Sequence, residues 1–279
     1  MINKNRMVLL VSLVMLTGCT NLKVVRDYAS ESAKFSAYTE LTDRYRDTYQ
    51  REQPYLDVED DKGEKATDEK RQAAYENLIK IHQSLTAYMQ TLAQLAGEDT
   101  FSLSKDVGAL SGSIQQLPEL GIGTDQVEAY TGIVQIVARW STTGKQERAV
   151  RKMVEEADPS VQKLLAGMRH LVGLYRKTNQ NERARVVGVF EVQIPFTGEP
   201  KDVLLNRLAR AHVQAKTWEY KQADQQYAKA EKALAAMAEG HRKLREGLAD
   251  LSREDLKQSL SQAAKDIKAI RENLKKGSA

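Results

Sequence analysis

The C-terminal part of this 279-residue chain carries apolar side chains at alternating steps of three and four residues. Such spacing gathers the apolar side chains on one face of a helix and is typical of helical bundles and coiled coils. It predicts two long helices that meet near Ser252, and a short connection makes such helices antiparallel. We therefore expect a long C-terminal helical hairpin over about residues 201–275. The pattern begins with Leu204, Leu208, Ala211, Ala215 and Trp218.

Helical spacing also marks most of the preceding chain. The content of 5 prolines and 6% aromatic residues suits long helices better than a β architecture with many turns. Asp158 and Pro159 are residue types that begin a helix, the first as a cap and the second at the first helical position. The helices that we expect here cover about residues 22–53, 67–96, 103–117, 125–141 and 145–178.

Two segments interrupt the helical pattern. Residues 57–69 carry seven acidic side chains, which predicts a solvated linker. Residues 187–196 alternate apolar and polar side chains, which favours a short extended segment, with a continued helix or an edge strand as alternatives. We therefore expect an all-α, elongated multi-helix bundle with at most this one extended segment. The alternating apolar residues are Phe190, Val192, Ile194 and Phe196.

The N-terminus resembles the signal peptide of bacterial lipoproteins. Lys4 and Arg6 precede an apolar run that ends in the sequence Leu16-Thr17-Gly18-Cys19, which is similar to a lipobox. The resemblance implies that residues 1–18 are cleaved and that Cys19 is acylated. Residues 19–279 then form one lipid-anchored helical domain.

Thr20 follows the lipidated cysteine. In lipoproteins of Gram-negative bacteria an aspartate in that place is typical of retention in the inner membrane, so the resemblance implies the periplasmic face of the outer membrane. Cys19 is the single cysteine of the chain, which excludes an internal disulfide or a multi-cysteine metal site.

An aromatic stripe follows the anchor on the first predicted helix. We interpret it as the seam that buries this helix, with a partner-binding face as the alternative. The segment around residues 187–196 offers a second candidate contact with a partner. The stripe comprises Tyr28, Phe35, Tyr38, Tyr45 and Tyr49.

A local excess of basic residues lies between Arg139 and Arg185, although the formal net charge of the whole chain, +4, is too small to indicate nucleic-acid binding. Such a face could lie against an anionic surface, or it could be a solvated face paired with the acidic residues 57–69. The candidate contacts are Arg139, Lys145, Arg148, Arg151, Lys152, Arg169, Arg176 and Lys177.

The sequence carries no G-x-S-x-G nucleophile elbow, Walker loop, dinucleotide-binding fingerprint or H-E-x-x-H zinc motif. No metal or cofactor is expected. The four histidines have no metal-binding spacing, and His82 and His241 occupy seam positions, where a histidine is usually a hydrogen-bonded core residue.

These features favour a lipid-anchored, non-enzymatic protein that binds another protein of the envelope, as a scaffold, an assembly accessory or an inhibitor. One alternative is a membrane-active protein that inserts or docks through the glycine-rich residues 101–140. A second alternative is an envelope hydrolase. Homo-oligomers remain compatible with the helical seams.

Overall fold

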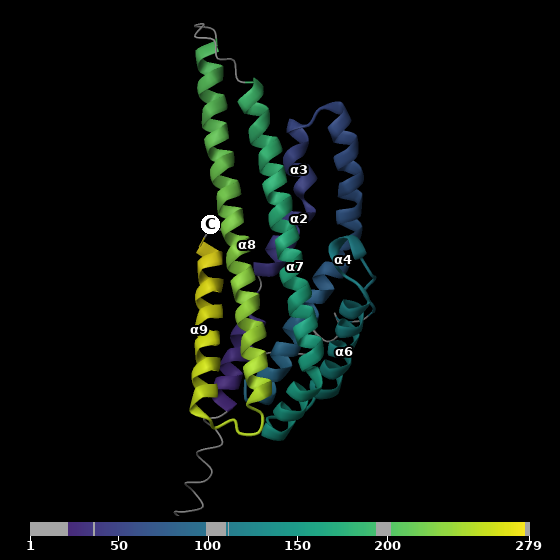
Figure 1. Ribbon diagram of the computed structural model, residues 1–279, viewed down its shortest axis with the longest axis vertical. Coiled ribbons are helices and arrows are strands. Elements are labelled where there is room, and N and C mark those ends of the chain that lie inside the picture. Colours follow the sequence, from purple (N-terminus) through teal and green to yellow (C-terminus); the bar gives the residue numbers. More distant parts are fainter. Residues whose placement is uncertain (1–21, 36, 99–109, 111, 194–201, 277–279) are drawn as a thin grey trace, which may run out of the picture.

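The structure, a computed structural model, describes residues 22–35, 37–98, 110, 112–193 and 202–276. These residues form an elongated all-α bundle, as predicted (Figure 1). Within the described ranges there is no β-strand, and only an isolated bridge joins Leu117 to Ile122. The predicted signal peptide and Cys19, the predicted site of lipidation, lie outside the described residues.

The described chain begins with a helix over residues 22–33. Most of the later helices run roughly along the long axis of the bundle (Figure 1). Their bounds are α2 Ala37–Arg46, α3 Thr48–Glu52, the 3₁₀ turn η1 Gln53–Tyr55, α4 Val58–Leu95, the 3₁₀ turn η2 Pro118–Leu120, α6 Thr124–Trp140, α7 Glu147–Gln193, α8 Val203–Glu246 and α9 Glu254–Lys276.

The predicted C-terminal hairpin is present as α8 and α9. Helix α8 has 44 residues and α9 has 23. At 1.5 Å per residue, α8 is ~66 Å long and α9 only ~35 Å. Since α9 packs on the C-terminal half of α8, the N-terminal half of α8 extends well beyond the end of α9 (Figure 1). Among the described helices, α7 and α8 contact each other most extensively.

The prediction of one continuous helix over residues 22–53 is wrong. The first helix ends near Lys34 and a new one begins at Ala37. His82 stabilises the break, because its Nε2 lies 3.1 Å from the Phe35 carbonyl oxygen, which a continuous helix would use internally. The hydroxyl of Ser32 also donates to the Tyr28 carbonyl, at 2.8 Å, a bond that weakens helix propagation.

The predicted acidic linker over residues 57–69 is wrong as well, because these residues form the first turns of α4. The Asp57 carboxylate caps the helix by accepting from the backbone amides of Glu59 and Asp60, at 3.0 and 2.9 Å. Acidic residues in a first helical turn are favourable because they face the positive end of the helix dipole.

Helix α7 begins near its predicted start but continues without a break through Pro159 to Gln193. Pro159 is exposed, so water can hydrate the Glu155 carbonyl that loses its helical partner. Asp158 is therefore not a helix cap, and its carboxylate instead lies 2.8 Å from His241 Nδ1.

The predicted extended segment is helical as far as Gln193. Val187 is buried and Phe190 half-buried, a spacing of three residues that places both on the side of α7 that faces the bundle. Val192 points into solvent. Ile194 and Phe196 lie outside the described residues.

The glycine-rich region is helical only in its second half. Helix α6 confirms the predicted helix at 125–141. Residues 112–117 are not helical, so the predicted helix at 103–117 is wrong at that end, and residues 103–109 and 111 lie outside the described ranges. The hydroxyl of Tyr130 on α6 donates to the carbonyls of Leu110 and Gly112, at 3.2 and 3.3 Å, and holds the preceding chain against α6.

Candidate functional site

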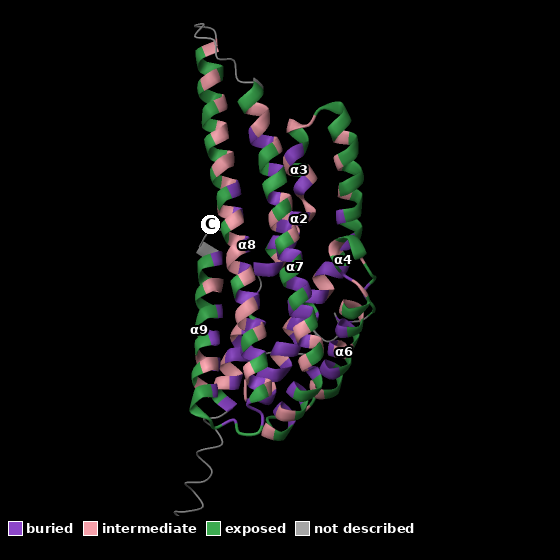
Figure 2. Cartoon of the chain, in the orientation of Figure 1, coloured by how far each residue is buried: buried purple, intermediate pink, exposed green. Residues whose placement is uncertain are grey.

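The N-terminal half of α8 exposes large apolar side chains to solvent. Leu204, Leu208 and Trp218 are 68%, 60% and 59% exposed. Buried residues are concentrated in the lower part of the bundle, whereas the upper end of α8 is half-buried or exposed (Figure 2). We call Leu204, Leu208, Ala211, Ala215 and Trp218 the α8 stripe, since their spacing of four and three residues puts them on one face of the helix.

The α8 stripe continues the face of α8 that binds α9. Lower on the helix, Ala236, Gly240 and Lys243 line a groove whose other wall is α9. Ala211 and Gly240 are about eight helical turns apart at 3.6 residues per turn, so they share one face. The same face is therefore covered by α9 in one half of α8, whereas none of the described helices covers it in the other half.

A shallow depression lies over the lower part of the α8 stripe, between Ala211 and Lys221. Ala211 and Ala215 present only methyl groups between the larger Leu208 and Trp218. The depression is open to solvent and mainly apolar. Its walls are Ala211, Gln214, Ala215, Thr217, Trp218 and Lys221.

Basic side chains flank the α8 stripe on one edge. Arg207, Arg210 and Lys221 are exposed, and none of them forms an ion pair within the described part of the chain. The ammonium group of Lys221 lies 5.7 Å from the centroid of the Trp218 ring. This edge of the surface is therefore both positively charged and free to bind an acidic group.

An aromatic cluster supports α8 on the opposite side. The hydroxyl of Tyr55 lies 2.7 Å from His212 Nε2, and the ring of Phe190 lies 5.1 Å from the His212 ring and 5.7 Å from the Tyr55 ring. These contacts join η1, α7 and α8. They fix the orientation of α8 at the level of the α8 stripe.

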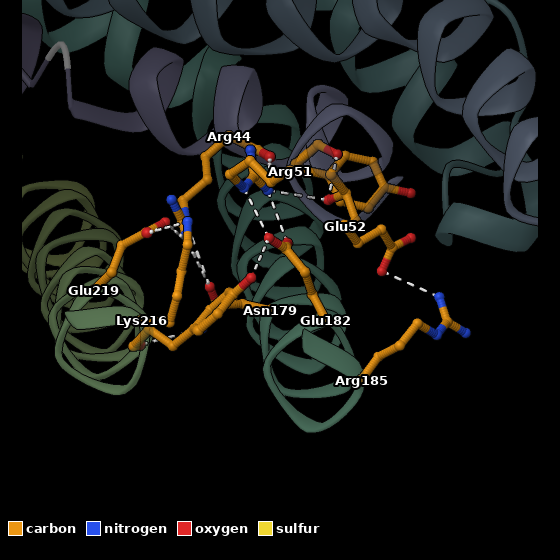
Figure 3. Close-up of polar contacts among 11 residues, drawn as sticks. Arg44, Arg51, Glu52, Asn179, Glu182, Arg185, Lys216 and Glu219 are labelled. Carbon is orange, nitrogen blue, oxygen red and sulfur yellow. Dashed lines mark hydrogen bonds and ion pairs between the residues drawn. The ribbon is translucent and has the colours of Figure 1, made fainter. Parts of the chain in front are cut away.

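An ionic cluster lies just below, between α2, α3, α7 and α8 (Figure 3). Arg51 forms a two-pronged ion pair with Glu182, with both N–O distances at 2.8 Å. The Glu182 side chain is 1% exposed, and its carboxylate also accepts from the Tyr220 hydroxyl at 2.9 Å. Arg44 extends the cluster to Glu219 on α8, at 3.2 Å, and to the side-chain oxygen of Asn179.

A second arm of the ionic cluster holds a pair of carboxyl groups. Arg185 on α7 lies 3.1 Å from the Glu52 carboxylate and 2.9 Å from that of Glu64 on α4. Burial, together with the negative charge of Glu64, raises the pKa of Glu52 to about 7. In the lower core, burial lowers the pKa of His82 to about 4.

The shifted pKa values of Glu52 and His82 predict opposite effects of pH on the stability of the protein. The unfolded chain protonates His82 below about 6.5 and the folded protein only below about 4, so His82 reduces stability as the pH falls through this range. Glu52 binds its proton more tightly in the folded state, between about 7 and 4.5, and so increases stability as the pH falls. The two effects should partly cancel in the wild type.

Glu52→Gln should therefore make the protein lose stability more steeply as the pH is lowered from 7 to 5. Urea unfolding at the two pH values measures this, as a larger drop of the midpoint in the variant. An equal drop in both proteins would contradict the assigned pKa of Glu52.

A buried polar chain lies in the lower core. His241 contacts Asp158 through Nδ1, at 2.8 Å, and the Tyr88 hydroxyl through Nε2, at 2.7 Å. This order of acid, histidine and hydroxyl resembles a proton relay, but both His241 and Tyr88 are fully buried. A substrate cannot reach the Tyr88 oxygen, so we interpret the chain as a structural link between α4, α7 and α8.

The described residues contain no candidate metal site. No group of three or more histidine, cysteine or acidic side chains among them could hold a metal ion. None of the helices in the described ranges combines the length and the apolar character needed to cross a membrane.

The predicted aromatic stripe lies in the core. Tyr28, Phe35, Tyr38 and Tyr45 are buried, in agreement with the interpretation as a seam, and no partner can contact them unless their helices undock. Tyr49 is half-buried and its hydroxyl donates to Asp61 at 2.9 Å. Of the second predicted segment, Phe190 belongs to the aromatic cluster and Val192 is exposed, whereas Ile194 and Phe196 are not described.

The predicted basic surface is not one continuous patch. Half of its members form ion pairs with acids of α7 or α8. The others are exposed, and Lys152 and Lys177 are ~38 Å apart along α7. The paired members are Arg139, Arg151, Arg169 and Arg176, and the others are Lys145, Arg148, Lys152 and Lys177.

The residues of the α8 stripe are part of the apolar pattern in the sequence. That pattern predicts an apolar face of a helix, but it is the same whether the face is buried or exposed. The unequal length of the two helices that meet near Ser252 is a signal for an exposed part of α8, but the sequence does not show whether another helix covers that part. No family model, curated protein or solved structure matches the chain in the three comparisons with known proteins.

Proposed function

We propose that this chain is a lipid-anchored protein of the bacterial envelope that acts by binding another protein through the α8 stripe. The observation that carries the proposal is the exposed apolar face of α8 above the end of α9. Isolated exposed apolar residues are common, but a row of them on one helical face marks an interaction surface.

The position of the α8 stripe suits an anchored binding protein. The hydroxyl of Tyr28, on the first helix, donates a hydrogen bond of 2.6 Å to the Met237 carbonyl, so this helix lies against the lower part of α8. Ala211 on the α8 stripe is ~39 Å farther along α8 than Met237. An acyl group on Cys19, only three residues before Leu22, would hold the lower end of the bundle near the membrane and leave the α8 stripe away from it.

The rigid attachment of α8 to the rest of the bundle also supports binding rather than catalysis. The ionic and aromatic clusters fix α8 in place, so a partner would meet a preformed surface and little ordering would be required on binding. The polar groups that are arranged as in a proton relay are buried, as described above.

Photo-crosslinking in intact cells tests the proposal. A photoreactive amino acid at position 208 or 215 should give a specific crosslink to one envelope protein. The same residue at position 268, on the exposed face of α9, is the matched control and should give none. Absence of a protein crosslink from both α8 positions, at native expression level, would contradict the proposed function.

The lipid anchor is tested separately by the mass of the N-terminal peptide of the mature protein. This peptide should begin at Cys19 and carry the acyl groups. A peptide that begins elsewhere, or an unmodified Cys19, would refute the anchor without refuting the binding surface.

A further inference from the structure

We infer that the partner of the α8 stripe is an acidic amphipathic helix, which lies along α8 in line with α9. This inference rests on the proposed function and adds the chemical nature of the partner. It depends on three properties of the surface: its continuity with the α9 interface, its shape and its charge.

Continuity with α9 indicates that the missing element is a helix. Helix α9 already packs against α8, and its buried residues Leu260, Ala263 and Ile267 are spaced by three and four positions. The α8 stripe has the same spacing. A helix that continues the line of α9 would meet the same geometry, with its apolar side chains set between those of α8.

The shape of the surface fits a helix with one large central side chain. Leu204 and Leu208 project at one end and Trp218 at the other, with the methyl groups of Ala211 and Ala215 between them. A leucine, methionine or phenylalanine from a facing helix would fill the depression over the two alanines and contact Trp218. The α8 stripe spans ~21 Å, which is about two heptads of a partner helix.

The charge of this surface indicates the charge of its partner. Residues 203–221 carry four basic side chains, Arg207, Arg210, Lys216 and Lys221, and one acid, Glu219. Lys216 and Glu219 pair with each other at 2.9 Å. Arg207, Arg210 and Lys221 thus present three charges on one edge, which complement glutamates or aspartates beside the seam of a partner helix.

The same charges disfavour a second copy of this chain as the partner of the α8 stripe. In an antiparallel pair of α8 stripes related by a two-fold axis, the basic edge of one copy would face the basic edge of the other. Like charges across a helical seam destabilise it. A flat anionic bilayer fits less well, because it cannot fill the depression over Ala211 and Ala215.

The experiment titrates the full mature chain in detergent with designed helical peptides and follows Trp218 fluorescence in a Trp140→Phe background. One peptide has a leucine seam flanked by glutamates. The second has the same seam flanked by lysines. The third probe is a set of vesicles that contain an anionic phospholipid.

We expect saturable binding of the glutamate peptide, with a blue shift as Trp218 leaves water, and weaker binding of the lysine peptide. Arg207→Glu combined with Arg210→Glu should reverse this preference and weaken the glutamate peptide about tenfold. Lys265→Glu with Lys268→Glu, on exposed positions of α9 with the same spacing, is the matched control and should leave binding unchanged.

Equal binding of the two peptides would overturn the inference, as would a response to anionic vesicles alone or concentration-dependent self-association through the α8 stripe. These outcomes are distinct from failure of the proposed function. If crosslinks in cells identify a protein whose contact segment is basic or not helical, the proposed function stands and the inference about the partner is wrong.

Discussion

Gly240→Ala is expected to destabilise the protein by ~1–3 kcal/mol, because the new methyl group has no space. A Cβ atom at Gly240 would lie 2.5 Å from Cε2 and 3.0 Å from Cζ of Tyr28. The ring of Tyr28 is fully buried and its hydroxyl is bonded to the Met237 carbonyl. The ring cannot move without loss of that bond, so the first helix should separate from α8.

Gly173→Ala is the matched control for this prediction. Gly173 is an exposed glycine inside α7, and a Cβ atom there would meet nothing within 4 Å. Alanine in an exposed helix interior should stabilise the protein by up to ~1 kcal/mol. Chemical denaturation of both variants should therefore give shifts of opposite sign. Two stabilised variants would show that Tyr28 does not pack against Gly240.

Sequence periodicity predicted the long helices well, because each buries one face against its neighbours and the apolar spacing records that face. It could not predict where the first helix breaks. No glycine or proline marks Lys34 and Phe35. The Ser32 hydroxyl weakens the helix only slightly, and the contact that stabilises the break comes from His82, which is 47 residues away from Phe35 in sequence. Tertiary contacts of this kind leave no local signal.

Local sequence signals differ from the observed structure in two other places. Asp158 and Pro159 have the residue types of a helix start, yet α7 continues through them. The buried residues on either side, such as Ala157 and Val161, pack into the core, and this packing outweighs the cost of a proline inside a helix. The acidic residues 57–69 looked like a linker, but acids in a first helical turn favour the helix. In both cases the deciding factor was the environment of the residue, not its type.

The candidate site shows the same limit. Leu204, Leu208 and Trp218 continue a pattern that is buried in the lower half of α8, and only the relative lengths of α8 and α9 decide which part stays exposed. The ionic cluster was also beyond prediction, because Arg51 and Glu182 are 131 residues apart. Periodicity identifies a face of a helix, and only the fold determines what covers it.

Glu182→Gln is expected to lower the free energy of unfolding by about 3 kcal/mol, the largest effect that we predict for a single substitution. The variant keeps the shape of the side chain but removes its charge. Arg51 would then remain in the ionic cluster without its ion-pair partner, while the Glu182 position stays 1% exposed. The loss should appear in urea unfolding.

Glu156→Gln is the control that separates burial from ion pairing as such. Glu156 pairs with Arg139 at 2.8 Å, but these side chains are 39% and 60% exposed. Pairs of this kind contribute ~0.2–1 kcal/mol. If the two substitutions cost the same, Arg51 and Glu182 must be as hydrated as the surface pair.

The effect of Glu182→Gln should also be local. Because the ionic cluster joins α3 to α7 and α8, hydrogen exchange in the variant should accelerate more at residues 203–220 than in α9. Arg51→Met combined with Glu182→Leu should restore much of the stability, since a buried ion pair can be replaced by apolar side chains more cheaply than it can be broken. If crosslinking at position 208 weakens in the single variant and returns in the double variant, then the rigidity of α8, rather than any charge in the ionic cluster, is what the partner requires.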